Sequence, residues 1–208
     1  MTHQEFWNDL YRKASPASSG APGLALAQFT GPLAAGHALE LGCARGDDAV
    51  WLARQGWTVT ATDISTVALG YAEENARRAG VAHRLSFEAH DLAVSFPKGR
   101  CDLVTASFLH SPQDWPRAKV LAQAAEAVSD AGHLLIVEHA SRAPWSWAPE
   151  TTRYPTAEDT LASLRLPDDM WQRLCVCQIA RRASGPDGQE ATVTDNIIFL
   201  QRLAGAET

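Results

Sequence analysis

The stretch ALELGCARGDDAVWLARQGWTVTATDIS, residues 38–65, decides the fold. It begins with a short apolar strand that ends at Gly42, and a tight turn then runs to Gly46. A segment with helical spacing of apolar residues follows, and residues 57–62 form a second apolar strand that Asp63 closes. Two strands joined through a helix are the building unit of a parallel sheet, whose ligands bind where the strands end.

The residues at these strand ends suit a cofactor that carries an adenosine. Gly42 leaves room for a close approach of the ligand, and Asp63 is placed to accept hydrogen bonds from a ribose diol. A dinucleotide fingerprint, G-x-G-x-x-G, is not matched, because Ala44 and Asp47 stand at its second and third glycines. The chain also lacks the G-K-[ST] of a P-loop.

S-adenosylmethionine (SAM) is the remaining cofactor of this kind, and it carries a sulfonium cation and no phosphate. An acidic turn is a poor cradle for phosphate but tolerates a neighbouring cation. Four acids surround the turn: Glu40, Asp47, Asp48 and Asp63. A nucleotide- or NAD-binding module without methyl transfer stays open as the alternative.

These motifs resemble those of the class I SAM-dependent methyltransferases. The matching residues are Glu40, Gly42 and Gly46 in the turn, Asp63 in TDIS, Asp91 in HDL, and the segment CDLVTASFLHS over residues 101–111. In layout the chain is also similar to the small tellurite-resistance and thiol-methyltransferase-like members. It departs from the family at Ala44, where a glycine is usual.

The resemblance implies SAM as cofactor, S-adenosylhomocysteine as product and in-line methyl transfer to a small-molecule acceptor. Asp63 would accept from the ribose, although a cap for the following helix is the structural alternative. Asp91 would meet the adenine amine, and a solvated loop acid is its alternative. Together the implied cofactor contacts are Glu40, Gly42, Cys43, Ala44, Gly46, Asp63, Ile64, Asp91, Leu92 and Ser107.

Strand and helix signals alternate along the whole chain. They predict an α/β, Rossmann-like, seven-stranded, mostly parallel sheet with helices on both faces and a C-terminal antiparallel hairpin. The expected strands are residues 37–41, 57–62, 83–89, 101–106, 134–138, 171–181 and 192–203. The expected helices are residues 4–13, 24–29, 47–55, 65–79, 116–128 and 156–164.

Composition favours one domain over residues 1–208, with a helical cap at 1–35 and a loop and helix at 141–170 near the substrate. The chain is 46% hydrophobic and 20% charged, which suffices for a full core. We expect no membrane span, because there is no long apolar run, and cytoplasmic placement, because the first residues lack a signal-peptide pattern. The net charge of −6 argues against nucleic acid as the main partner, and the oligomeric state is open.

The four cysteines are expected to be reduced, largely buried thiols, and no metal site is expected. Histidines are not found at ligand spacing from Cys175 or Cys177. The other two are Cys43 and Cys101.

Two histidines and four aromatic residues are the candidates for the acceptor side. His110 and His139 follow strands whose ends meet at the site, and imidazole titrates near neutral pH. Each has a loop histidine bonded to backbone as its alternative. Tryptophans 145 and 147 lie in a proline-rich loop after a strand, and Trp7 and Tyr11 lie one helical turn apart. We expect Trp7, Tyr11, Trp145 and Trp147 to line the acceptor pocket.

Overall fold

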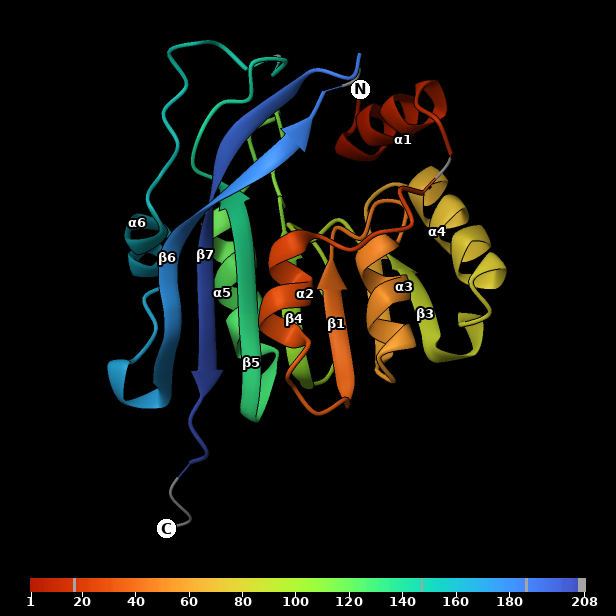
Figure 1. Ribbon diagram of the computed structural model, residues 1–208. Coiled ribbons are helices and arrows are strands. Elements are labelled where there is room, and N and C mark those ends of the chain that lie inside the picture. Colours follow the sequence, from red (N-terminus) through yellow and green to blue (C-terminus); the bar gives the residue numbers. More distant parts are fainter. Residues whose placement is uncertain (17, 147, 186, 206–208) are drawn as a thin grey trace.

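The computed structural model describes residues 1–16, 18–146, 148–185 and 187–205. Within them, seven strands form a single sheet in the order β3-β2-β1-β4-β5-β7-β6 (Figure 1). The strands are β1 (His37–Leu41), β2 (Thr58–Asp63), β3 (Leu85–Ala89), β4 (Cys101–Ser107), β5 (Val128–His139), β6 (Trp171–Ser184) and β7 (Glu190–Arg202). The helices are α1 (His3–Lys13), α2 (Leu24–Thr30), α3 (Asp47–Arg54), α4 (Thr66–Arg78), α5 (Arg117–Glu126) and α6 (Ala157–Ser163). Short 3-10 turns cover Ala82–Arg84 and Asp168–Met170.

The predicted Rossmann-like sheet with a C-terminal antiparallel hairpin is confirmed. Strands β1 to β5 pair in parallel, and β7 lies between β5 and β6 and pairs with both in the antiparallel sense. Two elements are longer than predicted from the sequence. Strand β5 already begins at Val128, because the segment expected to be a turn joins the strand, and both strands of the C-terminal hairpin extend further towards its turn. All carboxyl ends of the parallel strands therefore meet at one edge of the sheet.

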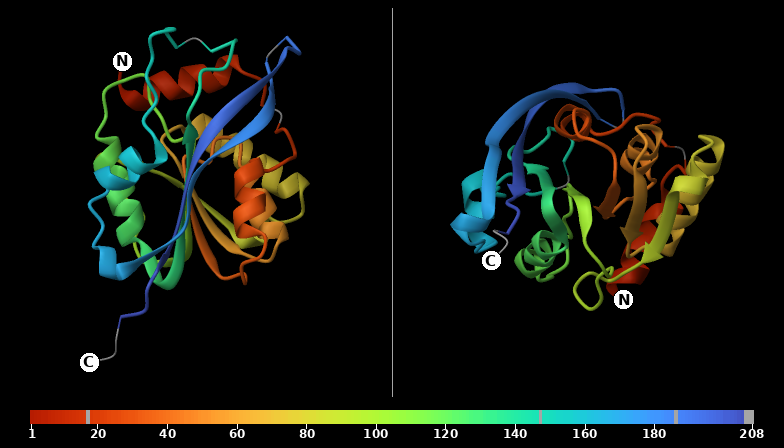
Figure 2. Two further views of the ribbon diagram at one scale, coloured as in Figure 1. Left: turned by 60° about the vertical axis from the view of Figure 1, so that its left-hand side comes forward. Right: turned by 90° about the horizontal axis from the view of Figure 1, so that it is seen from below.

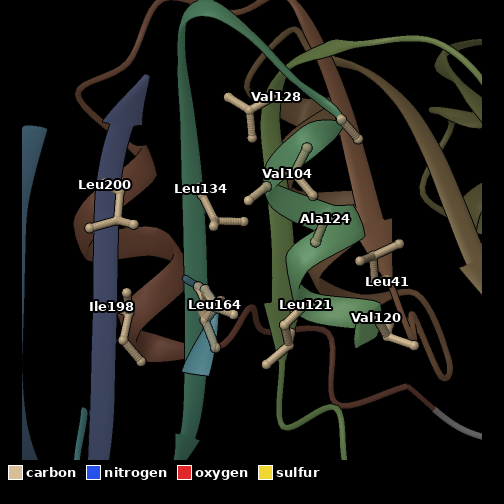
Figure 3. Close-up of a cluster of buried hydrophobic side chains, with 14 of the residues drawn as sticks. Leu41, Val104, Val120, Leu121, Ala124, Val128, Leu134, Leu164, Ile198 and Leu200 are labelled. Carbon is tan, nitrogen blue, oxygen red and sulfur yellow. The ribbon is translucent and has the colours of Figure 1, made fainter. Parts of the chain in front are cut away.

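Helices cover both faces of the sheet (Figure 2), and the sheet separates two apolar clusters. Helices α5 and α6 pack on one face, where Leu121 and Leu134 are fully buried (Figure 3). Helices α2, α3 and α4 pack on the other, around Leu52 and Val59. Only α1 of the expected 1–35 cap lies over the strand ends, since α2 buries Leu26 against the sheet face.

Two cysteines correct the expectation of reduced thiols. Cys175 and Cys177 form a disulfide on β6, while Cys43 and Cys101 are free. Residues two apart on a strand project from the same face, so this pair meets without any turn of the chain. Within the described residues, no helix is long and apolar enough to cross a membrane.

A cluster of buried polar side chains around Glu138 joins several elements at the carboxyl end of β5. The carboxylate of Glu138 is fully buried and accepts from Arg117 Nη2 at 2.7 Å, Thr160 Oγ1 at 2.6 Å and Asn196 Nδ2 at 3.1 Å. Arg117 also donates from Nε to the carbonyl oxygen of Leu109 at 3.0 Å. Glu138 thereby holds α5, α6, β7 and the loop after β4 to one point.

Replacing this buried carboxylate should lower the free energy of unfolding far more than replacing an exposed one. We expect Glu138→Ala to lower the free energy of unfolding by roughly 3–5 kcal/mol, because Arg117 loses its partner and two further hydrogen bonds are lost. Glu158→Ala removes an exposed partner of Arg173 and should cost less than about 1 kcal/mol. Urea denaturation of both variants measures the difference, and equal costs would contradict the buried role of Glu138.

Candidate functional site

The glycine turn lies at the centre of the strand-end edge. The amide groups of Gly42 and Cys43 both donate to the carbonyl oxygen of Thr62, at 2.8 Å each, which ties the turn to β2. Gly42 has a φ of 76° and Gly46 a φ of 77°, a left-handed conformation that favours glycine. A Cβ on Gly42 would come within 2.7 Å of Leu109 Cδ1, so this position tolerates no side chain as the loop stands.

Asp63 links the turn to the next helix. Its Oδ2 accepts from the amide of Ala44 at 3.0 Å and its Oδ1 accepts from the amide of Ser65 at 2.8 Å. Burial raises the pKa of this carboxyl, and the backbone hydrogen bonds oppose that rise. Ala44 itself adopts a left-handed φ of 51°, which explains why a glycine suits this position better.

A pocket of about 120 Å³ opens beside these residues at the carboxyl ends of the strands. It brings together five of the residues expected to hold the cofactor, since Gly42, Asp63, Ile64, Asp91 and Leu92 all line it. The loop after β4 contributes the rest of the wall on that side, with Phe108, Leu109, His110 and Ser111. Cys43 is buried in the apolar core, and Ser107 lines a different cavity.

Helix α1 closes the pocket from above (Figure 1). His3, Trp7 and Tyr11 project into its wall, and the Trp7 and Tyr11 rings lie 6.4 Å apart. Gln4 donates to the carbonyl oxygen of Ile64 at 3.1 Å, and Asn8 Oδ1 accepts from Ser65 Oγ at 2.8 Å. Both bonds hold α1 near Asp63, and the predicted pair Trp7 and Tyr11 lines the same pocket as Asp63.

Glu40 lies buried behind the turn. Burial raises its pKa well above the ordinary value, and the neighbouring carboxylates of Asp48 and Asp63 raise it further. Among the described residues its Oε2 has no hydrogen-bond partner. A buried oxygen in this condition suits a cationic group placed next to the turn.

The other two acids of the turn hold a loop of the N-terminal segment. Asp47 accepts from the amide of Gly20 at 2.8 Å and from the hydroxyl of Ser18, and Asp48 accepts from the amide of Gly23 at 2.6 Å. Sequence reasoning placed these acids near the cofactor but missed this anchoring role. Serines and glycines twenty-five or more residues away give no local signal of it.

His110 lines the pocket with a neutral ring. Burial, and then the nearby cations, lower its pKa to about 4. Its Nε2 is buried and has no hydrogen-bond partner among the described residues. A neutral imidazole with a free nitrogen facing the site is equipped to hold a polar group of a ligand.

His139 stands behind His110 rather than in the pocket wall. Its ring stacks on Phe108 at 4.5 Å and on His110 at 5.9 Å, measured between centroids. Its Nδ1 lies 3.6 Å from Oδ1 of the buried Asp195, which accepts from Arg181 Nε at 2.5 Å. Asp195 and Arg181, from β7 and β6, were missed by sequence reasoning because only the hairpin brings them here.

Trp145 lies outside the wall of this pocket. The ring of Trp145 packs against Gly185 in the β6–β7 turn, where a Cβ on the glycine would come within 2.7 Å of it. Of the described residues, Trp115 lines the pocket from the loop after β4, and Trp145 does not. Trp147 lies outside the described residues.

The residues present fit an adenosine-bearing cofactor with a cationic tail. The carboxylate of Asp63, the unpartnered oxygen of Glu40 and the side-chain-free backbone of Gly42 in the pocket wall are the three features it requires. The pocket volume is below the usual range of roughly 300–1,000 Å³. Since the side chain of Leu109 lies over Gly42, its rotation and a shift of α1 are the changes that would enlarge the space.

Comparison with known proteins agrees with this site. Residues 38–132 match the family model described as "Methyltransferase domain". The resemblance to the class I methyltransferases is confirmed. The matched segment runs from β1 to the first part of β5 and so includes the glycine turn, Asp63 and Asp91.

Solved structures of methyltransferases share the fold. A structure from work on the conversion of a disulfide bond into a thioacetal group during echinomycin biosynthesis has a TM-score of 0.73 at 21% identity, over 99% of this chain and 95% of that one. TehB from Haemophilus influenzae has a TM-score of 0.67 at 16% identity, over 94% of this chain and 66% of that one. A SAM-dependent methyltransferase from Geobacter sulfurreducens, in complex with S-adenosylhomocysteine, has a TM-score of 0.59 at 19% identity, over 81% and 71%. A search of the curated proteins found no match.

The low pKa of His110 gives the fold an acid sensitivity that can be measured. The folded pKa of about 4 lies below the ordinary histidine pKa of 6.5, so the stability that the neutral ring contributes is present above pH 6.5 and is lost as the pH falls towards 4. When the pH is lowered from 7.5 to 5, the free energy of unfolding should fall by roughly 2 kcal/mol more in the wild type than in His110→Asn, which has no imidazole to protonate. Urea denaturation at the two pH values checks this, with His3→Asn on α1 as the control. Parallel losses in the wild type and His110→Asn would contradict it.

Proposed function

We propose that this protein is a SAM-dependent methyltransferase that acts on a small-molecule acceptor. One observation carries the proposal: the buried carboxylate of Asp63 closes β2 and lines a pocket with Gly42, Asp91 and Leu92, inside the matched methyltransferase segment. When bound, SAM supplies an activated methyl group on a sulfonium. A cytoplasmic location and the absence of nucleic acid among its partners stay predictions from the sequence.

The cofactor contacts divide between the two ends of the site. Asp63 would accept hydrogen bonds from the ribose hydroxyls, because each oxygen keeps a further lone pair after its bond to Ala44 or Ser65. Asp91 and Leu92 would hold the adenine, while Glu40 would pair with the methionine ammonium through its unpartnered Oε2. Gly42, Cys43, Ala44 and Gly46 form the turn, and Ile64 and Ser107 flank it.

Methyl transfer needs alignment of the acceptor and exclusion of water more than it needs new charge. Helix α1 supplies the cover, since Trp7 and Tyr11 project into the wall of the pocket. Burial and the charge of Asp63 raise the pKa of Tyr11, so its hydroxyl stays protonated, and the guanidinium of Arg45 lies 5.4 Å over its ring. These contacts keep the cover next to the ribose.

The two histidines would divide the work on the acceptor. His110 is neutral and a weak base, so it would orient the acceptor by a hydrogen bond from or to Nε2. His139 Nδ1 lies 3.6 Å from Oδ1 of Asp195. Because His110 is a weak base, His139 is the candidate to receive a proton from a thiol, hydroxyl or amine acceptor.

The decisive measurement is calorimetric binding of S-adenosylhomocysteine to Asp63→Ala. We expect a loss of roughly 1–3 kcal/mol, about fivefold to 150-fold in Kd, because charge-assisted hydrogen bonds to the ribose are removed. Asp102→Ala is the matched control. Asp102 also accepts a backbone amide, that of His37 at 2.8 Å, but lies at the opposite ends of the strands.

The same titrations separate this function from the alternative. The wild type and Asp102→Ala should bind S-adenosylhomocysteine alike and should give no heat with NAD. Tight binding of NAD, or an unchanged affinity in a folded Asp63→Ala, would contradict a SAM site at the end of β2.

A further inference from the structure

A second cavity lies on the α2 face of the sheet, next to the cofactor pocket. Its volume is about 630 Å³, within the range of roughly 300–1,000 Å³ that small-molecule sites occupy. The ends of β4 and β5, helix α2 and the β6–β7 hairpin form its walls. The side chains of Phe108 and Ser107 mark where it approaches the glycine turn.

Phe108 is the wall that the two spaces share, since it lines both. Its backbone has a left-handed φ of 52°, which is uncommon for a bulky side chain. The ring is held from two sides, by the guanidinium of Arg181 at 5.5 Å and by the imidazole of His139 at 4.5 Å. A molecule in the second cavity would therefore be separated from the cofactor pocket by one ring.

The charges around the second cavity are compensated in pairs. Arg181 donates to Asp195 on the neighbouring strand, and Arg182 pairs with Glu190. The rest of the lining is largely apolar, with Leu26 and Val137 at the base and Leu24, which is 58% exposed, on α2. An ionic occupant would lose its water against these apolar side chains, whereas a neutral one would not. The polar groups open to a hydrogen bond are the remaining N–H groups of Arg181 and Oδ1 of Asp195, which has no hydrogen-bond partner among the described residues.

We propose that this second cavity is the acceptor site and that it takes a neutral, mainly apolar small molecule. The proposal rests on the methyltransferase function proposed above. The occupant would lie against Phe108, with the remaining N–H groups of Arg181 as its polar contacts. The reacting atom would approach the methyl group past Phe108, beside His110 and His139. Trp145, which packs on the hairpin turn, would shape the site only indirectly.

The test places a larger side chain of β6 in the second cavity. Ala180 lines the cavity from β6, and Ala180→Phe would occupy part of it. Ala183 lies three residues further along the same strand and is not among the lining residues, so Ala183→Phe is the matched control. The probes are benzyl mercaptan, which is neutral near pH 7, and its anionic analogue 4-(mercaptomethyl)benzoate.

Binding of each probe is measured by NMR titration of the complex with S-adenosylhomocysteine, whose own Kd is measured by calorimetry in every variant. We expect benzyl mercaptan to bind the wild type and Ala183→Phe within twofold, and Ala180→Phe at least tenfold more weakly. The affinity for S-adenosylhomocysteine should stay the same in all three.

Three outcomes would overturn the acceptor site while leaving the cofactor site intact. They are unchanged binding of benzyl mercaptan in Ala180→Phe, tighter binding of the benzoate than of the neutral thiol, and no binding of benzyl mercaptan to the wild-type complex. Failure of the wild type to bind S-adenosylhomocysteine is a separate result, and it would remove the proposed function itself.

Discussion

The structure of the site depends on the two backbone hydrogen bonds that Asp63 accepts. One fixes Ala44 and with it the glycine turn, and the other fixes Ser65, where α4 begins. Ser65 in turn bonds to Asn8 of α1. The carboxylate of Asp63 at the end of β2 thus positions the glycine turn and the start of α4 directly, and helix α1 through Ser65. The ligand role proposed for Asp63 and its structural role would use different lone pairs of the same two oxygens.

The acidic side chains around the glycine turn determine which ligand charge the pocket favours. Glu40, Asp48 and Asp63 are all buried or nearly so, and burial is the largest cause of the raised pKa of each carboxyl. A cationic ligand group placed among them relieves their mutual repulsion, whereas a phosphate would add to it. The electrostatics of the turn thereby favour a sulfonium and ammonium cofactor over a dinucleotide, for the same reason that the sequence pattern does.

The sequence predicted the parts of the molecule that local rules govern. The alternation of strand and helix signals predicted the mostly parallel sheet with its C-terminal hairpin, and the strand-end pattern singled out Gly42 and Asp63. It did not predict Arg181 or Asp195, because their meeting with His139 depends on the register of a long hairpin. Trp145 was expected in the acceptor pocket, yet its ring packs on Gly185 in the hairpin turn, a contact that no periodicity encodes.

The same hairpin explains how the acceptor side differs in kind from the cofactor side. The residues proposed to contact the cofactor lie within a few positions of a strand end, so their places are set by the parallel sheet alone. The proposed acceptor side combines Arg181 of β6, Phe108 of the loop after β4 and His139 of β5, stacked in one row. Each member contacts the next, and Asp195 contacts both ends of the row, Arg181 and His139. Under the proposed assignment, a change of hairpin length or register would alter which acceptor fits and leave the glycine turn and Asp63 undisturbed.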